Sequence, residues 1–292
     1  SSLEKKWGRE FEGCIRTLHS KGLELLREHW KREIGNSNPP RKWIFAGKTE
    51  ILGQDLGWFP KKGEKLGTAK LPKEIKKSDI KKLYDLLRVN LLKPNTESLL
   101  SLAEEGHHEY FQEKDLEVIS KCLSEIQEES IARWKDSVDF TDMIWMPWVF
   151  QLEPSNYPSL FLCDEAQDLS PAQLALALRL AGDSRKVFVG DPNQSIFGFA
   201  GADTESFAKI QEALGENAPE FSLPVCYRCP KEVISLVQDN FSFPFYPHEN
   251  AKEGNIEITE LDLHQMAKPG TVVLCRNNLP LFQQVYSLLN VG

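Results

Sequence analysis

The sequence of 292 residues lacks any apolar run that approaches the roughly 18 residues of a membrane-spanning helix. Its first 30 residues are rich in charge, whereas a signal peptide has an apolar centre. Because neither an anchor nor a secretion signal is expected, the sequence predicts a cytoplasmic protein.

Cysteine is scarce as well, with six residues spread thinly along the chain. Three of them end apolar runs, where a small buried thiol suits a protein core. We therefore expect no disulfides. Cys226 and Cys229 have the spacing of two zinc ligands, but no second Cys or His pair lies nearby in the sequence, which disfavours a metal site there.

A net positive charge is also absent, since the formal charge is −8 at pH 7. The charge is unevenly distributed, because residues 1–100 carry 22 Lys and Arg against 13 Asp and Glu, a balance of +9. Residues 101–292 carry 13 against 30, a balance of −17. Electrostatic attraction is local, so the basic part keeps a polyanionic partner possible. The composition, 41% hydrophobic and 27% charged, is typical of a folded globular protein and excludes disorder for most of the chain.

The character of the sequence changes along the chain. Residues 1–34 are expected to form a short strand within CIRTLHS, a polar loop and a helix that Gly35 stops. Residues 35–77 are rich in Lys, Gly and Pro and are expected to be mostly irregular. Residues 78–137 have helical periodicity, with Ser78 predicted as an N-cap and a second cap signal in NTESLL. We predict four segments: 1–34, a mainly helical insertion at 35–137, 138–214, and a second α/β unit at 215–292.

From residue 138 the pattern alternates between strand and helix. The runs YPSLFLC and RKVFVG predict strands that are buried on both faces. Between them, Ser170 and Gln173 form a capping box, Pro171 takes the first helical position and Gly182 ends the helix. A strand, helix and strand with short loops predict a parallel sheet. Further helices are expected at 203–214 and in PKEVISLVQDNF, and further strands near NIEITEL and TVVLC.

Polar side chains follow both predicted strands at their carboxyl ends, the edge where α/β sheets bind ligands. Asp164 and Glu165 follow the first strand, and a carboxylate there can hold Mg²⁺ while its neighbour activates a water. Taken alone, such acids more often cap the next helix, and Asp168 is expected to organise the turn toward Ser170. Gln194, with Asp191 and Asn193, follows the second strand, where an amide suits contact with a phosphate oxygen or a lytic water.

Phe197 and Phe199 follow within five residues of Gln194, in a Gly-rich segment. Exposed aromatic rings beside a phosphate-binding edge are what base stacking requires. The alternative, that Phe197 plugs the end of the sheet, is equally open.

Three ordered motifs now resemble one family. DEAQD, then VGDPNQSIFGFAGAD, then LPVCYRCP are similar to the helicase motifs of UvrD/Rep-type superfamily 1 DNA helicases. TLHSKGLELL, VDFTDMI and VVLCRNN resemble three further segments of that family. The matched motifs run from residue 17 to residue 278 and so span nearly the whole chain.

The resemblance implies a fold, a cofactor and site residues. The fold would be α/β, a RecA-like parallel sheet of the P-loop NTPase type, with a helical insertion and the start of a second RecA-like domain. ATP and Mg²⁺ would bind, with Asp164 coordinating the metal and Glu165 activating water. Gln194 would sense the γ-phosphate, Tyr227 would stack on adenine, and Arg228 would be the arginine finger.

The resemblance also implies DNA contacts. The backbone of single-stranded DNA would meet the start of the first helix, and bases would stack on aromatic side chains. The implied DNA-binding residues are Thr17, His19, Ser20, Phe197, Phe199 and Arg276. Ala200 stands where the family often has Arg, which leaves one contact in doubt. A single histidine such as His19 is more often a structural residue than a binding residue. Only its place in the TLHS motif favours a DNA contact.

The phosphate-binding loop of this family, GxxxxGK[ST], is missing. GKTE at residues 47–50 is interpreted as a chance match, because Lys42 stands where the loop needs Gly and no strand-to-helix context is expected. We therefore expect an internal fragment that is inactive on its own.

The sequence thus predicts part of an ATP-dependent DNA helicase or translocase that moves 3′ to 5′ on single-stranded DNA, unwinds duplex junctions, and acts in DNA repair, replication or recombination. In a bacterium or phage it would associate with the nucleoid. Two alternatives remain: the motor part of a RecB/AddA-like helicase-nuclease, and a non-catalytic single-strand-binding relic.

Overall fold

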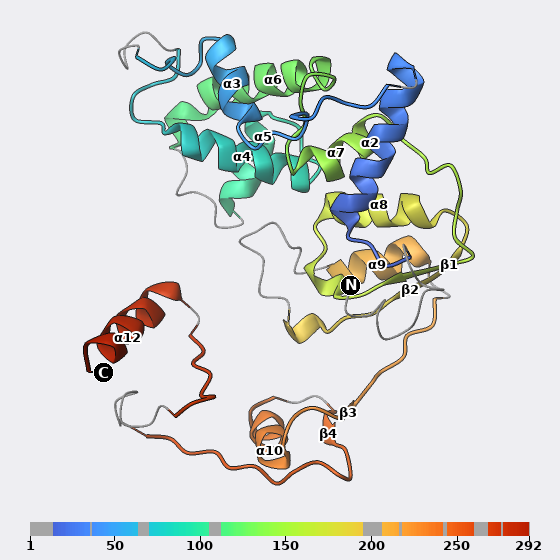
Figure 1. Cartoon of the computed structure of the whole chain (residues 1–292), viewed down its shortest axis with the longest axis vertical. Helices are drawn as coiled ribbons and strands as arrows, with labels where there is room; N and C mark the ends of the chain where they lie inside the picture. The colour runs from blue at the N-terminus through green and yellow to red at the C-terminus, as the bar shows by residue number, and fades with distance from the viewer. Residues whose placement is uncertain are drawn as a thin grey trace. The chain divides into compact units, whose positions relative to one another are not determined.

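The computed structural model of the chain describes residues 14–35, 37–63, 70–104, 112–194, 206–215, 218–241, 244–259, 268–275 and 277–291 (Figure 1). The chain divides into two compact units, Ser1–Ala218 and Pro219–Gly292, and each is described here by itself. No helix of the described ranges is both long and apolar enough to cross a membrane.

A helical cluster forms one part of the first unit. Its core is built from apolar residues three and four positions apart, such as Leu83 and Leu87 in one helix and Ile119 and Leu123 in another, all fully buried. The helices are α3 (Lys48–Asp55), α4 (Lys77–Val89), α5 (Thr96–Leu102), the short 3-10 helix η5 (Glu113–Asp115) and α6 (Leu116–Ala132).

The helical prediction for residues 78–137 is confirmed over their described part, with two corrections nearby. The N-cap of α4 is Lys76, not Ser78, whose hydroxyl donates to Asp79 inside the helix. A helix, α3, occupies part of the segment predicted as mostly irregular. Of the apolar side chains of α3, Leu52 reaches the core while Ile51 stays exposed. The sequence of α3 therefore shows little helical periodicity of apolar residues, and the helix depends on packing against its neighbours.

The α/β part of the first unit contains helices α2 (Leu18–Ile34), α7 (Asp142–Val149), α8 (Pro171–Ala181) and α9 (Ser206–Leu214), and strands β1 (Leu160–Cys163) and β2 (Arg185–Phe188). The strands pair in parallel, with Leu160 opposite Arg185 and Cys163 opposite Phe188. Helix α8 lies between the sheet and the pair α2 and α7 (Figure 1). The predicted strands, the parallel sheet and α8 with its capping box are confirmed.

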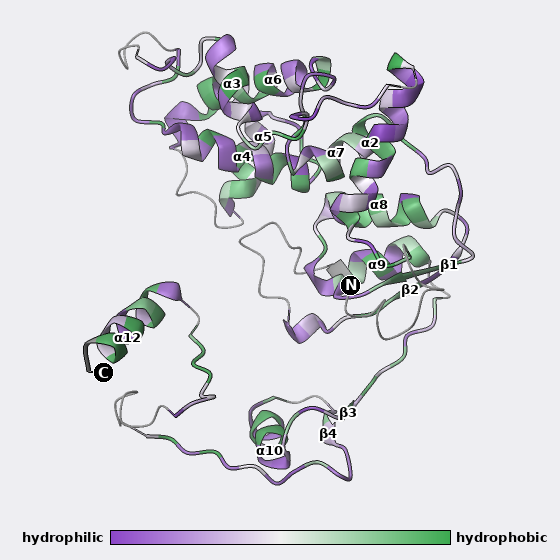
Figure 2. Cartoon of the chain, viewed as in Figure 1, coloured by the Kyte–Doolittle hydropathy of each residue, from purple (hydrophilic) through white to green (hydrophobic). Residues whose placement is uncertain are grey.

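The prediction that both strands are buried on two faces is wrong for the described molecule. Strand β1 is hydrophobic along its length (Figure 2), whereas β2 begins with Arg185 and Lys186. Leu162 of β1 is 66% exposed and Val187 of β2 is 37% exposed. Successive side chains point to opposite faces, and Phe161 and Phe188 on the other face pack against the core beside Cys163. One face of this sheet is therefore covered among the described residues and the other is not.

The short strand predicted within CIRTLHS is not present in its described part, residues 14–20. Helix α2 begins at Leu18 instead, because the Thr17 hydroxyl accepts a hydrogen bond from Ser20 N at 3.2 Å and acts as the N-cap. His19 and Ser20 are consequently helical residues.

The second unit contains a two-residue parallel pair, β3 (Val225–Cys226) and β4 (Tyr246–Pro247), with helices α10 (Lys231–Asn240) and α12 (Asn278–Val291). Helix α10 confirms the prediction for PKEVISLVQDNF. The strands predicted near NIEITEL and TVVLC do not form in the described residues 255–259 and 271–275. Ile258 is fully exposed and Leu274 is 89% exposed, and a strand needs a neighbour for its backbone hydrogen bonds.

A buried ionic network joins the helical cluster to the α/β part. Arg88 of α4 is fully buried and donates to Asp139 at 2.8 Å and to Asp142 at 2.6 Å. Its guanidinium also lies 4.0 Å from the ring centre of Tyr84. Burial acts to lower the pKa of Arg88, but Asp139 and Asp142 outweigh it and raise that pKa, so the charge is held in place.

Lys48 of the GKTE segment belongs to the same network. Its ammonium donates to Asp142 at 2.7 Å and to the carbonyl of Ser130 at 3.1 Å. Helix α3 begins at Lys48, but the described residues before it form only an isolated bridge at Ile44 rather than a strand, so the segment has no strand-to-helix context. The ammonium is also buried and committed to Asp142, which supports the interpretation of GKTE as a chance match to a phosphate loop.

Replacing Asp142 with Ala is expected to lower the free energy of unfolding by about 3–5 kcal/mol, because it leaves two buried cations short of their counter-charge. Denaturant unfolding followed by circular dichroism measures the change. The matched control is Asp136→Ala, which removes an ion pair with Arg133 from a carboxylate that is 63% exposed and should cost less than about 1 kcal/mol. Equal losses in the two variants would contradict a stabilising role for the network.

Candidate functional site

The two parallel strands bring two loops to one edge of the sheet. Hydrogen bonding continues past the strands, because Val189 N donates to Cys163 O at 2.8 Å and Ala166 N donates to Val189 O at 2.9 Å. Asp164 and Glu165 therefore leave β1 beside the segment that leaves β2 at Gly190. This is the carboxyl edge, where α/β sheets bind ligands.

Glu165 has a left-handed backbone, with φ 52° and ψ 43°. A residue with a Cβ pays about 1–2 kcal/mol for this conformation. Its amide N–H donates to Asp164 Oδ1 at 3.1 Å, and its carbonyl accepts from Asp168 N at 3.0 Å. Both carboxylates, of Asp164 and Glu165, remain exposed to solvent.

Gln167 connects the two loops, and the sequence analysis missed it. Its side chain is 98% buried, with 2% exposed, and its amide nitrogen donates to Glu165 Oε2 at 2.7 Å. Its amide oxygen accepts from Asp191 N at 3.0 Å. Gln167 is the one neutral polar residue within DEAQD. That position could have indicated a bridging role, because an amide side chain can both donate and accept hydrogen bonds.

The segment after β2 continues this chain of hydrogen bonds. Asp191 precedes the 3-10 helix η7 (Pro192–Gln194). Its carboxylate accepts hydrogen bonds from the side-chain amide of Gln194 at 2.8 Å and from Asn193 N at 3.0 Å. Glu165, Gln167, Asp191 and Gln194 are thus linked in series. The predicted site residues Asp164, Glu165 and Gln194 therefore belong to one edge of the sheet.

Gly190 is needed where the loops approach. A Cβ at this position would lie 2.2 Å from Gln167 Oε1 and 2.9 Å from Ala166 N. Atoms at such distances overlap, so glycine permits the backbone of one loop to lie against the side chain of the other.

Asp168 does not cap α8. Ser170 does so, since its hydroxyl accepts from Gln173 N at 3.3 Å while Gln173 Oε1 accepts from Ser170 N at 2.8 Å. Asp168 ends the 3-10 helix η6 (Ala166–Asp168), and its Oδ1 is buried without a hydrogen-bond partner among the described residues. Burial, followed by the nearby Glu165 carboxylate, raises the pKa of Asp168.

The predicted DNA contacts Thr17, His19 and Ser20 lie at the start of α2. Leu18, between them, packs against the cluster that contains Cys163, the last residue of β1. Thr17 caps the helix, and the His19 ring lies 4.3 Å from the ring of Phe140. Burial lowers the pKa of His19.

Two of the remaining predicted residues lie in the second unit, and the others lie outside the described residues. Tyr227 and Arg228 lie in the second unit, where both are exposed and the Tyr227 ring lies 4.6 Å from the ring of His248. Phe197, Phe199 and Arg276 lie outside the described residues, as does Ala200.

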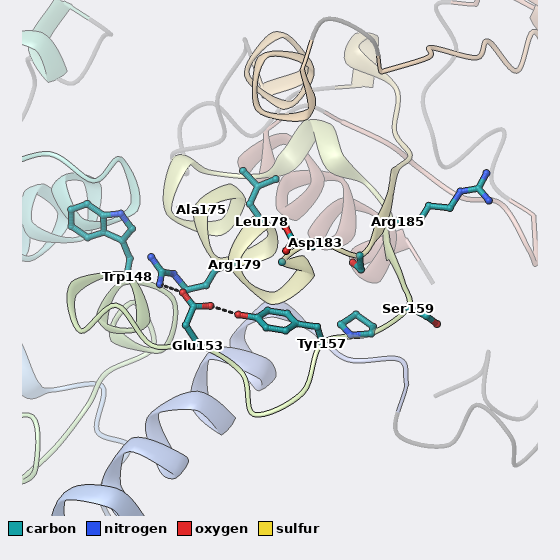
Figure 3. Close-up of a pocket in the computed structure, with 12 residues that line it drawn as sticks. Trp148, Glu153, Tyr157, Ser159, Ala175, Leu178, Arg179, Asp183 and Arg185 are labelled. Atoms are coloured by element: carbon teal, nitrogen blue, oxygen red, sulfur yellow. Dashed lines mark hydrogen bonds and ion pairs between the residues drawn. The ribbon is translucent and has the colours of Figure 1, made fainter.

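A hollow of about 820 Å³ opens at the opposite edge of the sheet, where the strands begin (Figure 3). Glu153 is one of its lining residues, and its carboxylate accepts from Arg179 at 2.5 Å and from the Tyr157 hydroxyl at 2.6 Å. It contains none of the residues that the sequence predicts for the site. The candidate site is therefore the carboxyl edge rather than this hollow.

Asp164 is the residue at the edge that fits a magnesium ion. Its carboxylate is exposed, and Mg²⁺ in phosphate-transfer sites commonly uses one or two carboxylates together with phosphate oxygens and waters. Among the described residues, no group of three or more His, Cys, Asp or Glu side chains forms a metal site supplied by protein alone. One exposed carboxylate would leave the other positions around a Mg²⁺ ion to phosphate oxygens and waters.

Replacing Gln167 with Ala is expected to lower the free energy of unfolding by about 1–3 kcal/mol, because a buried donor and acceptor lose their partners. Thermal and denaturant unfolding measure the loss. Gln211→Ala, at an exposed position of α9, is the matched control and should stay within about 0.5 kcal/mol of the unchanged protein. If the two variants were equally stable, the bridge between the loops would have no energetic role.

His19 should make stability depend on pH. Its pKa is lower in the folded chain than in the unfolded chain, so the unfolded chain takes up the proton first as pH falls below about 6.5. The free energy of unfolding should therefore fall between about pH 7 and pH 5, and fall less steeply in His19→Gln. Unfolding curves at a series of pH values give both slopes, and parallel slopes would contradict the assignment.

Comparison with known proteins agrees with the motifs. Residues 5–214 match the UvrD/REP helicase N-terminal domain. The mitochondrial ATP-dependent DNA helicase HMI1 of Saccharomyces cerevisiae is 26% identical over 133 residues, 45% of this chain and 19% of that protein. DNA helicase II of Salmonella typhimurium is 33% identical over 118 residues, 35% of this chain and 16% of that protein.

The RecB subunit of the RecBCD enzyme of Haemophilus influenzae is 31% identical over 112 residues, 37% of this chain and 9% of that protein. The alignments thus span less than a fifth of each relative's length. The family match, by contrast, covers most of this chain and includes the two strands, α8 and the linked carboxyl edge. The resemblance read from the motifs is confirmed: the chain belongs to the UvrD/REP helicase family.

Proposed function

We propose that this chain is part of an ATP-dependent DNA helicase or translocase that couples ATP hydrolysis to 3′ to 5′ movement on single-stranded DNA and to unwinding of duplex junctions. The observation that carries the proposal is the linked edge of the sheet. There Glu165, Gln167, Asp191 and Gln194 are joined in series by hydrogen bonds.

The chemistry follows from the side chains at that edge. Asp164 would hold Mg²⁺, which neutralises charge on the phosphates of ATP when it is bound. Glu165 would accept a proton from the attacking water. One of its carboxylate oxygens accepts a hydrogen bond from Gln167, which orients the carboxylate, and the residue is exposed to solvent. Gln194 would contact the γ-phosphate, and any shift of its amide would be passed to Asp191 and Gln167. A RecA-like sheet of the P-loop NTPase type is the proposed fold around them.

Two residues of the second unit are assigned roles of their own in the proposal. Tyr227 is 78% exposed, which suits a ring that stacks on adenine, and the exposed Arg228 suits an arginine finger. We assign DNA contacts to Thr17, His19 and Ser20 at the start of α2, and to Phe197, Phe199 and Arg276. The exposed positions of Thr17 and Ser20 at this helix start support the first of these.

The test compares Glu165→Gln with the matched control Glu117→Gln, which changes an exposed carboxylate of α6 in the helical cluster. In the full-length protein, Glu165→Gln should lower DNA-stimulated ATP hydrolysis by about 10²–10⁴-fold, the usual contribution of a general base, while ATP binding is retained. Glu117→Gln should hydrolyse ATP at the unchanged rate. Steady-state phosphate release and fluorescent-nucleotide titration measure the two quantities.

Equal hydrolysis by the two variants would remove Glu165 from the mechanism. Absence of hydrolysis in the unchanged full-length protein, with binding to single-stranded DNA retained, would instead favour the non-catalytic relic.

The similarity to a RecB subunit supports a second candidate, the motor part of a helicase-nuclease. Degradation of linear DNA by the full-length protein, dependent on ATP and Mg²⁺, separates it from a simple helicase.

A further inference from the structure

Cys226 and Cys229 are brought together by a tight turn in the second unit. Cys226 ends β3, and its carbonyl accepts from His248 N at 3.0 Å beside β4. Pro230 is the N-cap of α10, so the chain must turn within three residues. Cys229 N donates to Cys226 Sγ at 3.4 Å, which closes the turn.

The two thiols also interact with each other. The hydrogen bond from Cys229 N to Cys226 Sγ holds the two residues at one turn, and both are partly exposed, so a small reagent has access to them. Desolvation acts to raise the pKa of Cys226, but hydrogen bonds from the backbone N–H groups of Cys229 and Arg228 outweigh it, and the pKa is lowered. Desolvation and the neighbouring Cys226 raise the pKa of Cys229. An activated thiol beside a less acidic one is the arrangement of redox-active Cys-x-x-Cys turns.

The other four cysteines differ from this pair. Cys122 and Cys163 are buried, and burial raises their pKa values to about 12 and about 11. Cys14 and Cys275 are exposed. Among the described residues, no group of three or more potential metal ligands includes this turn, which offers two thiols.

We propose that Cys226 and Cys229 form a redox-active dithiol, which closes to an intrachain disulfide by exchange with a low-molecular-weight disulfide. The thiolate of Cys226 attacks one sulfur of the small disulfide, breaks its S–S bond and releases one thiolate, which takes up a proton. The Cys229 thiol then loses its proton to solvent, and its sulfur attacks Cys226 Sγ to release the second small thiol. Two protein thiols are oxidised by two electrons, and one disulfide is reduced to two thiols.

The disulfide would change the turn between the two cysteines. The closed ring contains Tyr227 and Arg228, so it restricts the backbone of both. The disulfide exchange does not require the proposed ATP hydrolysis. Tyr227 and Arg228, to which the proposed function assigns nucleotide contacts, nevertheless lie inside the disulfide ring.

The test uses a Cys14→Ser, Cys275→Ser background, which removes the two exposed single thiols. The protein is treated with oxidised glutathione, alkylated and digested with trypsin without reduction. Cleavage after Arg228 should leave peptide 210–228 joined to peptide 229–231, with a mass two hydrogen atoms below the sum of the reduced peptides. Dithiothreitol should separate them.

Two variants assign the roles of the cysteines. Cys229→Ser should accumulate glutathione on Cys226, because the second sulfur that would release it is missing. Cys226→Ser should form neither the joined peptides nor a comparable amount of glutathione adduct on Cys229. Reduced and unlinked peptides in the background protein, or equal glutathione uptake by the two variants, would overturn the proposal.

A third measurement follows the turn itself. Amide hydrogen exchange within residues 225–231 should slow after oxidation in the background protein and remain unchanged in Cys226→Ser. Bound zinc that protects both thiols from alkylation would overturn the dithiol in favour of a metal site.

Discussion

The parallel pairing of β1 with β2 is the constraint on which the candidate site depends. Parallel strands end at the same edge, so two segments more than 20 residues apart in the sequence arrive together after Cys163 and Phe188. Gln167 then fixes one segment against the other, and Gly190 leaves room for it to do so. Without the pairing, the carboxylates of DEAQD and the amide of Gln194 would have no common location.

A second constraint is charge buried between the helical cluster and the α/β part. Arg88 and Lys48 come from the cluster, whereas Asp139 and Asp142 lie at the start of α7, which packs on α2 and α8. A buried cation tolerates few positions for its counter-charge, so these contacts fix how the two parts meet. The VDFTDMI segment that resembles a helicase motif is thus also an anchor for the helical cluster.

Features encoded by neighbouring residues could be predicted from the sequence. The capping box of Ser170 and Gln173, α8, α10 and both strands of the parallel pair depend on local signals, and each is present. The link from Gln167 to Asp191 and the pairing of Arg88 with Asp139 and Asp142 could not be predicted, because these partners lie 24 and 51 or more residues away along the chain. The same reason explains α3, which local periodicity did not indicate. The strand expected near Ile258 failed for the converse reason, since an apolar alternation does not supply a pairing partner.

The left-handed backbone at Glu165 has a consequence for which residues the position can hold. Glycine, asparagine and aspartate adopt this conformation more readily than glutamate does. Residue 165 is nevertheless a glutamate, at a position whose backbone conformation favours shorter side chains. The side chain of glutamate extends farther from the backbone than that of aspartate. Local folding preference at residue 165 thus favours a shorter side chain, whereas the hydrogen bond with Gln167 is made by the longer glutamate.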